Sequence, residues 1–163
     1  MAEVDYGLLA RQVEALAEGE GHWLPLLANT AALLWDALPD INWVGFYLHA
    51  CNGPTDELVL GPFQGRIACT HIALGAGVCG TAAARDVTQL VPNVHEFPGH
   101  IACDSASSAE VVVPLHDAHG QVAAVLDLDS PTRERFDEED AQGLELVGHA
   151  IERAVDLAGP ALA

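Results

Sequence analysis

The strongest constraint on the fold of this chain is a pair of apolar segments, residues 110–115 and 121–129, whose acids fall at alternate positions of one face. Alternation with a period of two is typical of strands that turn one face toward a hydrophobic core. Residues 117–120 between the segments, Asp-Ala-His-Gly, have the composition of a hairpin turn. The sequence therefore predicts an antiparallel strand pair with one apolar face and one face that carries carboxylates.

Three acids are expected to share that second face. If a four-residue turn joins the strands, Glu110 lies directly opposite Asp127, and Asp129 points to the same side two residues further on. Because like charges across a sheet are destabilising, such a cluster requires a compensating cation or a shared proton. A shared proton would raise the pKa of one carboxyl and make it a candidate proton donor. The alternative interpretation is that these acids are the solvated rim of an edge strand.

The rest of the chain predicts an α+β fold. Apolar residues at helical spacing indicate helices over residues 5–18, 22–38 and 137–158, the last of which begins at a capping Asp137. Shorter β-rich segments predict strands over 42–48, 58–60, 66–72 and 88–91, with a short helix over 81–85. We therefore expect an antiparallel sheet flanked by helices.

The length of 163 residues suits one domain. We expect residues 1–163 to form a single unit, with N-terminal helices over 1–39, the sheet and an active-site loop over 40–130, and a closing helix over 137–158. Six arginines and no lysine stand against 24 acids, which gives a formal net charge of -18. A surface this negative repels phosphate backbones and anionic lipids, so we expect neither nucleic acid nor a membrane as a partner.

Cysteine chemistry is the second feature that the sequence indicates. Four cysteines occur in a chain whose first residues, MAEVDYGLLARQ, lack the pattern of a secretory signal. We therefore expect a cytoplasmic protein, in which reactive or metal-bound thiols are more common than structural disulfides. Cys103 lies in a segment without periodicity, residues 92–109, and we expect an exposed, reactive thiol there, with an inert small side chain as the alternative.

The other cysteines leave more than one interpretation open. Cys69 is predicted to lie in a strand, and Cys79 lies where a glycine-rich turn opens a helix. A thiolate stabilised by the helix N-terminus and simple packing account equally well for Cys79. We assign no role to Cys51. A thiol that attacks an oxidised substrate becomes a sulfenic acid, and a second thiol restores it by condensation, so several cysteines around one pocket suit such a cycle.

Two further patterns are weak. Residues 75–80, Gly-Ala-Gly-Val-Cys-Gly, have the spacing of a dinucleotide-binding loop, but the expected helix is too short for the crossover of a parallel sheet. Cys69 and His71, with Cys79 and Cys103, offer zinc ligands, but they lack the paired spacing of known zinc sites. We therefore expect no metal and no cofactor.

Four segments together resemble a known family. They are LVLGPFQGRIACTHI (58–72), GAGVCGTA (75–82), HEFPGHIACDSASSAEVVVPL (95–115) and VLDLDS (125–130). In this order they are similar to the free methionine-(R)-sulfoxide reductases, which have the GAF fold. The specific feature is that three separated cysteine motifs recur together, whereas ordinary GAF domains are sensory modules that lack this triple.

The resemblance implies an enzyme that reduces the R-epimer of free, not peptide-bound, methionine sulfoxide. It implies Cys103 as the nucleophile, Cys69 as the resolving thiol and Cys79 as a further thiol. The positions that match the pocket carboxylates and the aromatic lining of the family are Glu110, Asp127, Asp129, Trp43 and Tyr47. It also implies thioredoxin as the reductant and a homodimer as the assembly.

The family chemistry agrees with the independent interpretation of the acids. We expect the Cys103 thiolate to attack the sulfoxide sulfur while a protonated carboxyl, Glu110 or one of the two aspartates, donates to the oxygen. The remaining acids would hold the substrate ammonium. The sequence leaves open which carboxyl carries the proton and whether Cys69 or Cys79 resolves the sulfenic acid. The alternative function is a GAF-type module that binds a small ligand or senses redox state without turnover.

Overall fold

The computed structural model of the protein describes residues 4–52, 55–100 and 106–158, and in this part of the chain six strands form one antiparallel sheet. In chain order the strands are β1 (Trp43–Asn52), β2 (Thr55–Gly65), β3 (His71–Ala73), β4 (Gln89–Val91), β5 (Ala109–His116) and β6 (Val122–Ser130). Their spatial order is β3-β2-β1-β6-β5-β4. Strand β6 therefore lies inside the sheet, between β1 and β5, and the hypothesis that its acids form the rim of an edge strand is wrong.

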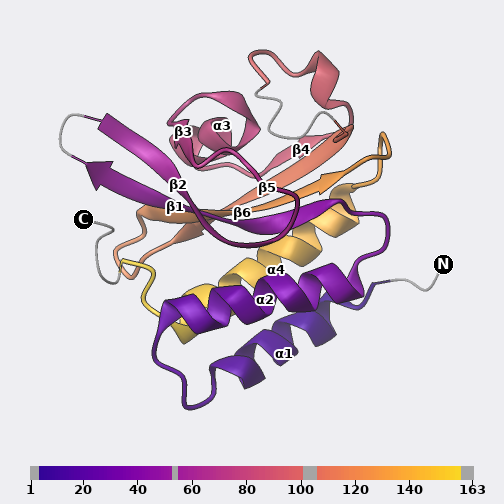
Figure 1. Ribbon diagram of the computed structural model, residues 1–163. Coiled ribbons are helices and arrows are strands. Elements are labelled where there is room, and N and C mark those ends of the chain that lie inside the picture. Colours follow the sequence, from indigo (N-terminus) through magenta and orange to yellow (C-terminus); the bar gives the residue numbers. More distant parts are fainter. Residues whose placement is uncertain (1–3, 53–54, 101–105, 159–163) are drawn as a thin grey trace.

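Helices cover both faces of this sheet (Figure 1). They are α1 (Tyr6–Ala17), α2 (Trp23–Ala37), α3 (Gly77–Arg85) and α4 (Glu138–Ala154), with a 3-10 turn η1 (Val94–Glu96) before β5. Helices α1, α2 and α4 lie together on one face, whereas α3 lies on the other face beside β3 (Figure 1). The α+β class predicted from the sequence is confirmed.

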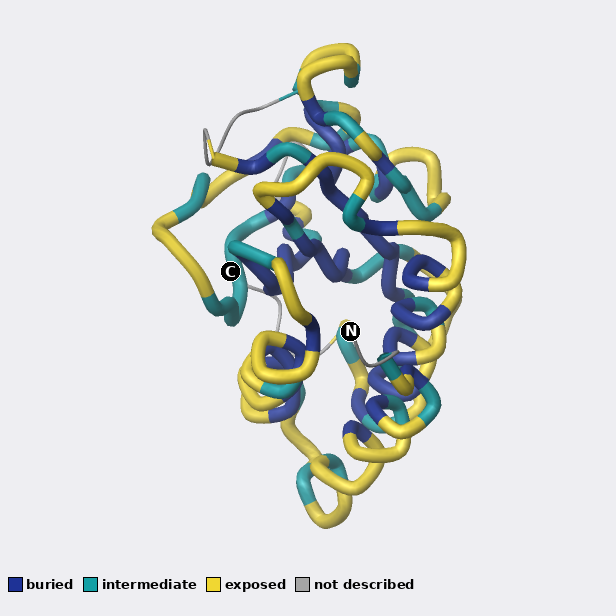
Figure 2. Tube along the Cα trace, turned by 90° about the vertical axis from the view of Figure 1, so that its right-hand side faces the viewer, coloured by how far each residue is buried: buried dark blue, intermediate teal, exposed yellow. Residues whose placement is uncertain are grey.

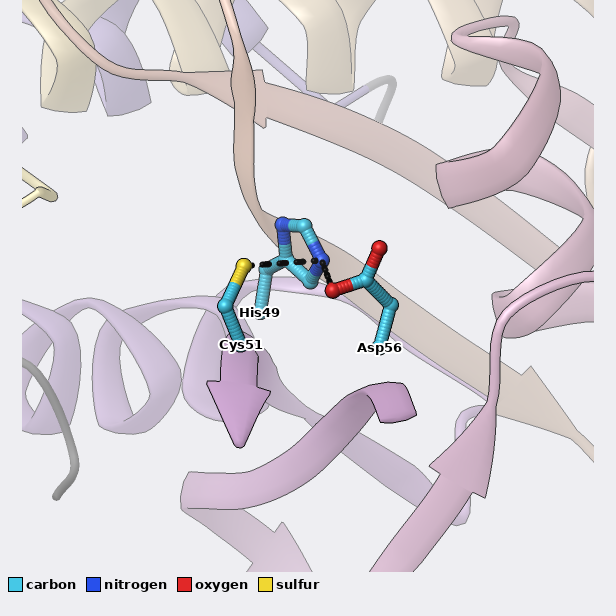
Figure 3. Close-up of side chains that lie close together, drawn as sticks. All are labelled: His49, Cys51 and Asp56. Carbon is cyan, nitrogen blue, oxygen red and sulfur yellow. Dashed lines mark hydrogen bonds and ion pairs between the residues drawn. The ribbon is translucent and has the colours of Figure 1, made fainter. Parts of the chain in front are cut away.

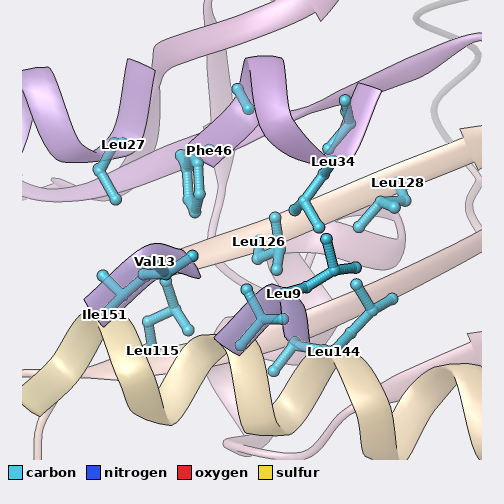
Figure 4. Close-up of a cluster of buried hydrophobic side chains, with 14 of the residues drawn as sticks. Leu9, Val13, Leu27, Leu34, Phe46, Leu115, Leu126, Leu128, Leu144 and Ile151 are labelled. Atoms are coloured by element: carbon cyan, nitrogen blue, oxygen red, sulfur yellow. The ribbon is translucent and has the colours of Figure 1, made fainter. Parts of the chain in front are cut away.

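The main hydrophobic core fills the space between the sheet and helices α1, α2 and α4. Figure 4 shows leucine, valine, isoleucine and phenylalanine side chains from all these elements packed together. Its fully buried members include Val13, Leu27, Leu34, Phe46, Leu126, Leu128, Leu144 and Ile151. Buried positions line the interior and exposed positions lie on the outer turns of the helices (Figure 2). This core holds one face of β1, β5 and β6 rigidly and leaves their other face for a second, smaller cluster.

The helices begin largely where the sequence predicts. Asp137 caps α4 through the backbone N–H groups of Glu139 and Asp140, and the Asp140 carboxylate accepts in return from the backbone N–H of Asp137. Helix α3 begins at Gly77, four residues earlier than expected. Among the described residues, none of the helices has the length and apolar character needed to cross a membrane.

Two expectations about the strands are wrong. Residues 66–70, predicted as part of a strand, are irregular, and only the short β3 follows them. In the β5–β6 hairpin Glu110 pairs with Asp129 rather than with Asp127. The register differs by two residues because the turn closes at Asp117 and Gln121 and because a bulge follows Leu115. A shift of two residues leaves every side chain on its predicted face.

Replacement of Leu126 by alanine tests the importance of the main core. Leu126 is fully buried on the central strand β6, so Leu126→Ala removes packed methyl groups and leaves a cavity. We expect the free energy of unfolding, measured by urea denaturation, to fall by about 2–5 kcal/mol. The matched control is Leu146→Ala on the exposed side of α4, which should change the stability by less than about 0.5 kcal/mol. Equal losses in the two variants would contradict this assignment of the core.

Candidate active site

A pocket opens on the sheet face opposite to the main core. Its walls come from β1, β5 and β6, from the start of α3, from the irregular segment after β2 and from the segment before β5. The lining residues are Trp43, Tyr47, Ile67, Ala68, Ile72, Ala76, Gly77, Val78, Cys79, His100, Ser107, Glu110, Asp127 and Asp129. Its empty volume is about 510 Å³, including the open mouth. The pocket thus combines apolar walls with three carboxylates.

The sheet places these three carboxylates on its floor. Glu110 on β5 is paired directly with Asp129 on β6, and Asp127 lies two residues along β6 on the same face. Only 7% of Glu110 and 5% of Asp127 is exposed, and Asp129 is half-buried. The prediction that the three acids share one face is confirmed. Both β5 and β6 are inner strands, so the three acids lie over the middle of the sheet rather than at its edge.

Burial changes the protonation of the cluster. Removal from water raises the pKa of Glu110 well above its ordinary value, and the charges of Asp127 and Asp129 raise it further. Burial also raises the pKa of Asp127, from 3.8 to about 7. The Oδ1 atom of Asp127 is buried and has no hydrogen-bond partner among the described residues. The pocket therefore retains a carboxyl proton near neutral pH and presents an unsatisfied oxygen to a ligand.

Cys79 lies against the acids at the first turn of α3. Its Sγ is 3.9 Å from Oε1 of Glu110, and the ligand atoms of Cys79, Glu110 and Asp127 all lie within 4.8 Å of one another. Burial raises the pKa of the Cys79 thiol, and the charges of Asp127 and Glu110 raise it further. This direction favours the packing interpretation of Cys79 over a thiolate stabilised by the helix N-terminus.

The glycine pattern before Cys79 has a packing explanation. The backbone N–H of Gly75 donates to the carbonyl of Gly80 over 2.8 Å, and Gly77 has a φ of 61°. A Cβ on Gly80 would lie 2.4 Å from the carbonyl oxygen of Ala73. These glycines let α3 begin close to β3, and they lie beside an antiparallel sheet rather than in a parallel crossover.

Two aromatic side chains hold the irregular segment over the pocket. The Tyr47 hydroxyl donates to the carbonyl of Cys69 over 2.9 Å, and Nε1 of Trp43 donates to the carbonyl of Arg66 over 3.1 Å. The two rings stack with centroids 5.8 Å apart. Their polar ends are thus satisfied by backbone while both residues line the pocket, as the resemblance implies.

The predicted thiols occupy different positions. Cys103 lies outside the described residues. Cys69 belongs to the irregular segment rather than to a strand, and it is disulfide-bonded. Cys51 is an exposed free thiol near the end of β1. In the part of the chain that the structure describes, the buried group with metal-ligating atoms joins Cys79 to Glu110 and Asp127, and His71 instead lies 3.3 Å from Glu57.

Sequence reasoning did not place two polar residues in the pocket. Nε2 of His100 lies 3.9 Å from Oε2 of Glu110, and burial, together with the charge of His95, lowers the pKa of His100. Ser107 is buried in the pocket wall and accepts a hydrogen bond from Nδ2 of Asn42 over 3.3 Å. Both belong to the segment before β5, and its lack of periodicity gave no indication of which side chains turn inward.

The fold and the pocket define a GAF domain, and residues 26–156 match the GAF domain family. The free methionine-R-sulfoxide reductase of Escherichia coli (strain K12) is 51% identical over 92% of this chain and 88% of its own length. The "fRMsr of Staphylococcus aureus (reduced form)" superposes with a TM-score of 0.87 at 48% identity, over 93% of this chain and 96% of its own. The Neisseria meningitidis enzyme, solved "in complex with its substrate", has a TM-score of 0.85 at 43% identity, over 94% and 92% of the two chains. The chain belongs to the free methionine-R-sulfoxide reductase family of GAF domains.

Replacement of Asp127 by asparagine tests the buried proton. Below about pH 4, Asp127 is protonated in both the folded and the unfolded chain. Between about pH 4 and pH 7 only the unfolded chain releases this proton, so the contribution of Asp127 to the free energy of unfolding falls as the pH rises. We expect the free energy of unfolding of Asp127→Asn, relative to the wild type, to increase over this window by an amount on the order of a few kcal/mol. Urea denaturation at several pH values measures this difference.

The control for this experiment is Asp117→Asn in the exposed hairpin turn. The backbone N–H of Gln121, followed by that of His119, lowers the pKa of Asp117, so Asp117 stabilises the fold above the ordinary aspartate pKa. The relative stability of this control should therefore not increase with pH. A difference between Asp127→Asn and the wild type that stays constant from pH 4 to pH 7 would refute the buried proton.

Proposed function

We propose that this protein reduces free methionine-(R)-sulfoxide to methionine. The observation that carries the proposal is the buried cluster of Glu110 and Asp127 on the pocket floor, beside a thiol and below an aromatic wall. Family membership supports it, since relatives from Escherichia coli and Saccharomyces cerevisiae carry the name free methionine-R-sulfoxide reductase. Related structures from Staphylococcus aureus and Neisseria meningitidis are described as complexes with substrate.

The carboxylates give a physical reason for the choice of a free amino acid. A substrate with a free ammonium group supplies the cation that a cluster of Glu110, Asp127 and Asp129 needs, and the unpartnered Oδ1 of Asp127 is suited to accept from it. A peptide-bound residue has an uncharged amide at this position. Trp43 and Tyr47 offer apolar surface for the methyl group and the side-chain stem.

The proposed reaction begins at the Cys103 thiolate. Its sulfur attacks the sulfoxide sulfur while a protonated carboxyl of the cluster donates to the sulfoxide oxygen, which supplies the one proton that the step consumes. Methionine leaves with the electron pair of the thiolate, and the oxygen remains on Cys103 as a sulfenic acid. The raised pKa values of Glu110 and Asp127 support one of these two groups as the donor.

The sulfenic acid is then resolved by a second thiol. Condensation forms a disulfide and releases water, and a dithiol reductant restores both thiols. We propose Cys69 for this role because it is already disulfide-bonded, whereas Cys79 is a buried thiol whose raised pKa disfavours the nucleophilic thiolate. Cys79 then remains a neutral thiol beside Glu110 or serves as an alternative resolving thiol.

The partners and the compartment are proposals that rest on family membership. Thioredoxin is the proposed reductant, and a homodimer is the proposed assembly. A catalytic disulfide that is reduced in every cycle requires a reducing compartment, which places the protein in the cytoplasm.

Single-turnover experiments without reductant test the roles of the thiols. Reduced wild-type protein should release one methionine per chain, and Cys103→Ser should release none because serine is not a nucleophile of comparable strength at neutral pH. Cys69→Ser is the matched control: it should still release one methionine but accumulate a sulfenic acid that a carbon nucleophile traps. Methionine release by Cys103→Ser, or a Cys69→Ser protein that neither reacts nor is trapped, would refute the proposed order.

Blocking the substrate amine tests recognition by the acids. N-acetyl-methionine-(R)-sulfoxide lacks the ammonium, so we expect its kcat/KM to be lower by at least about 100-fold, in line with the cost of leaving buried charged groups unpaired. Asp127→Asn should reduce this preference by lowering kcat/KM for the free amino acid more than for the acetylated one. Comparable kcat/KM values for the two substrates in the wild type would contradict recognition of the amine.

A further inference from the structure

A second group of reactive side chains lies on the surface near the end of β1 and the start of β2. It consists of His49, Cys51 and Asp56, and it includes the one cysteine that received no role above. His49 is half-buried, whereas Cys51 and Asp56 are exposed. None of the three belongs to the lining of the active-site pocket. We propose that this cluster binds one divalent transition-metal ion of the zinc type.

Strand pairing places the three side chains together. His49 and Cys51 are two residues apart on β1 and therefore share a face, and Asp56 on β2 is paired directly with Cys51. The Sγ atom of Cys51 lies 3.9 Å from Nε2 of His49, and Oδ1 of Asp56 lies 3.9 Å from the same nitrogen (Figure 3). The cluster therefore rests on regular sheet geometry rather than on a loop.

The imidazole of His49 is oriented as a ligand. Its Nδ1 lies 2.9 Å from the carbonyl oxygen of Val122 on β6, which accepts only, so the ring proton belongs on Nδ1. Nε2 then keeps a free lone pair, and the Asp56 carboxylate lies beyond this nitrogen, whereas the line from the Cys51 sulfur to Nε2 crosses the ring (Figure 3). A hydrogen bond from the second ring nitrogen to a backbone carbonyl is the usual support of a metal-bound histidine, because it fixes both the tautomer and the ring orientation.

A catalytic triad is the competing interpretation, and the geometry disfavours it. In a triad the acid binds one ring nitrogen of the histidine and the nucleophile faces the other. Here the Cys51 thiol and the Asp56 carboxylate face the same nitrogen, and Val122 occupies the other one. Three ligand atoms that all lie within 4.8 Å of one another suit a metal site better than a triad.

The distances suit a small tetrahedral ion. Zinc binds imidazole nitrogen, carboxylate oxygen and thiolate sulfur at about 2.0–2.3 Å, which places its ligands roughly 3.3–3.6 Å apart. The observed separations of 3.9 Å need a contraction of a few tenths of an ångström, which the exposed Cys51 and Asp56 can provide by side-chain rotation. Water supplies the fourth ligand, and the net charge of -18 favours cations over the whole surface.

Binding involves no electron transfer. The Cys51 thiol gives its proton to solvent as its sulfur forms a bond to the ion, and the imidazole and the carboxylate contribute lone pairs. The ion would join the end of β1 to the start of β2 and would fix these two strand ends to each other. This inference does not depend on the proposed reductase activity.

Competition for Zn²⁺ against a chromophoric chelator, with fully reduced protein, tests the site. We expect Cys51→Ala and His49→Gln to weaken Zn²⁺ binding at this site by more than about tenfold, because each removes a protein ligand. The matched control is His71→Gln, which replaces another surface histidine beside a carboxylate and should keep the wild-type affinity. Equal Zn²⁺ affinity in the wild type and Cys51→Ala, or no competition by the wild type, would overturn the proposal.

Cobalt spectroscopy separates this site from the pocket thiols. Thiolate-bound Co²⁺ gives a sulfur-to-metal charge-transfer band in the near ultraviolet, and we expect this band in the wild type and in Cys79→Ser but not in Cys51→Ser. Cys51 is exposed, so its replacement leaves the fold unchanged. A band that persists in Cys51→Ser and disappears in Cys79→Ser would assign metal binding to the pocket and refute the surface site.

Discussion

Burial of carboxylates on inner strands of the sheet is the constraint on which the site depends. Asp127 and Asp129 lie on β6, which β1 and β5 flank, and Glu110 faces them from β5. A carboxylate in such a place loses most of its hydration, so its neutral form is favoured and protons are retained. The sheet thus produces, from ordinary acids, groups that hold a proton at neutral pH, in the pocket that we propose receives the ammonium group of the substrate.

Strand alternation allows one sheet to serve both stability and chemistry. Leu126 and Leu128 point into the main core against the helices, while Asp127 and Asp129, which alternate with them in the sequence, point into the pocket. The rigid packing of one face fixes the positions of the acids on the other within the pleat. Stability and site geometry are therefore coupled through the same few residues of β6, and a cavity in the core would be expected to disturb the pocket.

The sequence predicts the shared face of the acids but not their register. A bulge after Leu115 and a turn that closes one residue later than expected shift the pairing by two residues. The amino-acid composition of the hairpin predicts neither of these features. Residues 66–70 look like a strand, but Trp43 and Tyr47 bind backbone carbonyls of this segment and hold it over the pocket instead. The surface cluster at Cys51 was not foreseen because the predicted strands ended before His49 and began after Asp56, so that their pairing was not considered.

The protonation state of the pocket at neutral pH is the central claim, and infrared difference spectroscopy measures it directly. Spectra of the wild type and of Glu110→Gln, recorded at pH 7 without substrate, should differ by the carbonyl stretch of a protonated carboxyl, because burial and the neighbouring aspartates raise the pKa of Glu110. Substrate binding should shift or remove this band. Spectra in which every carboxyl of the wild type is ionised at pH 7 would contradict the account.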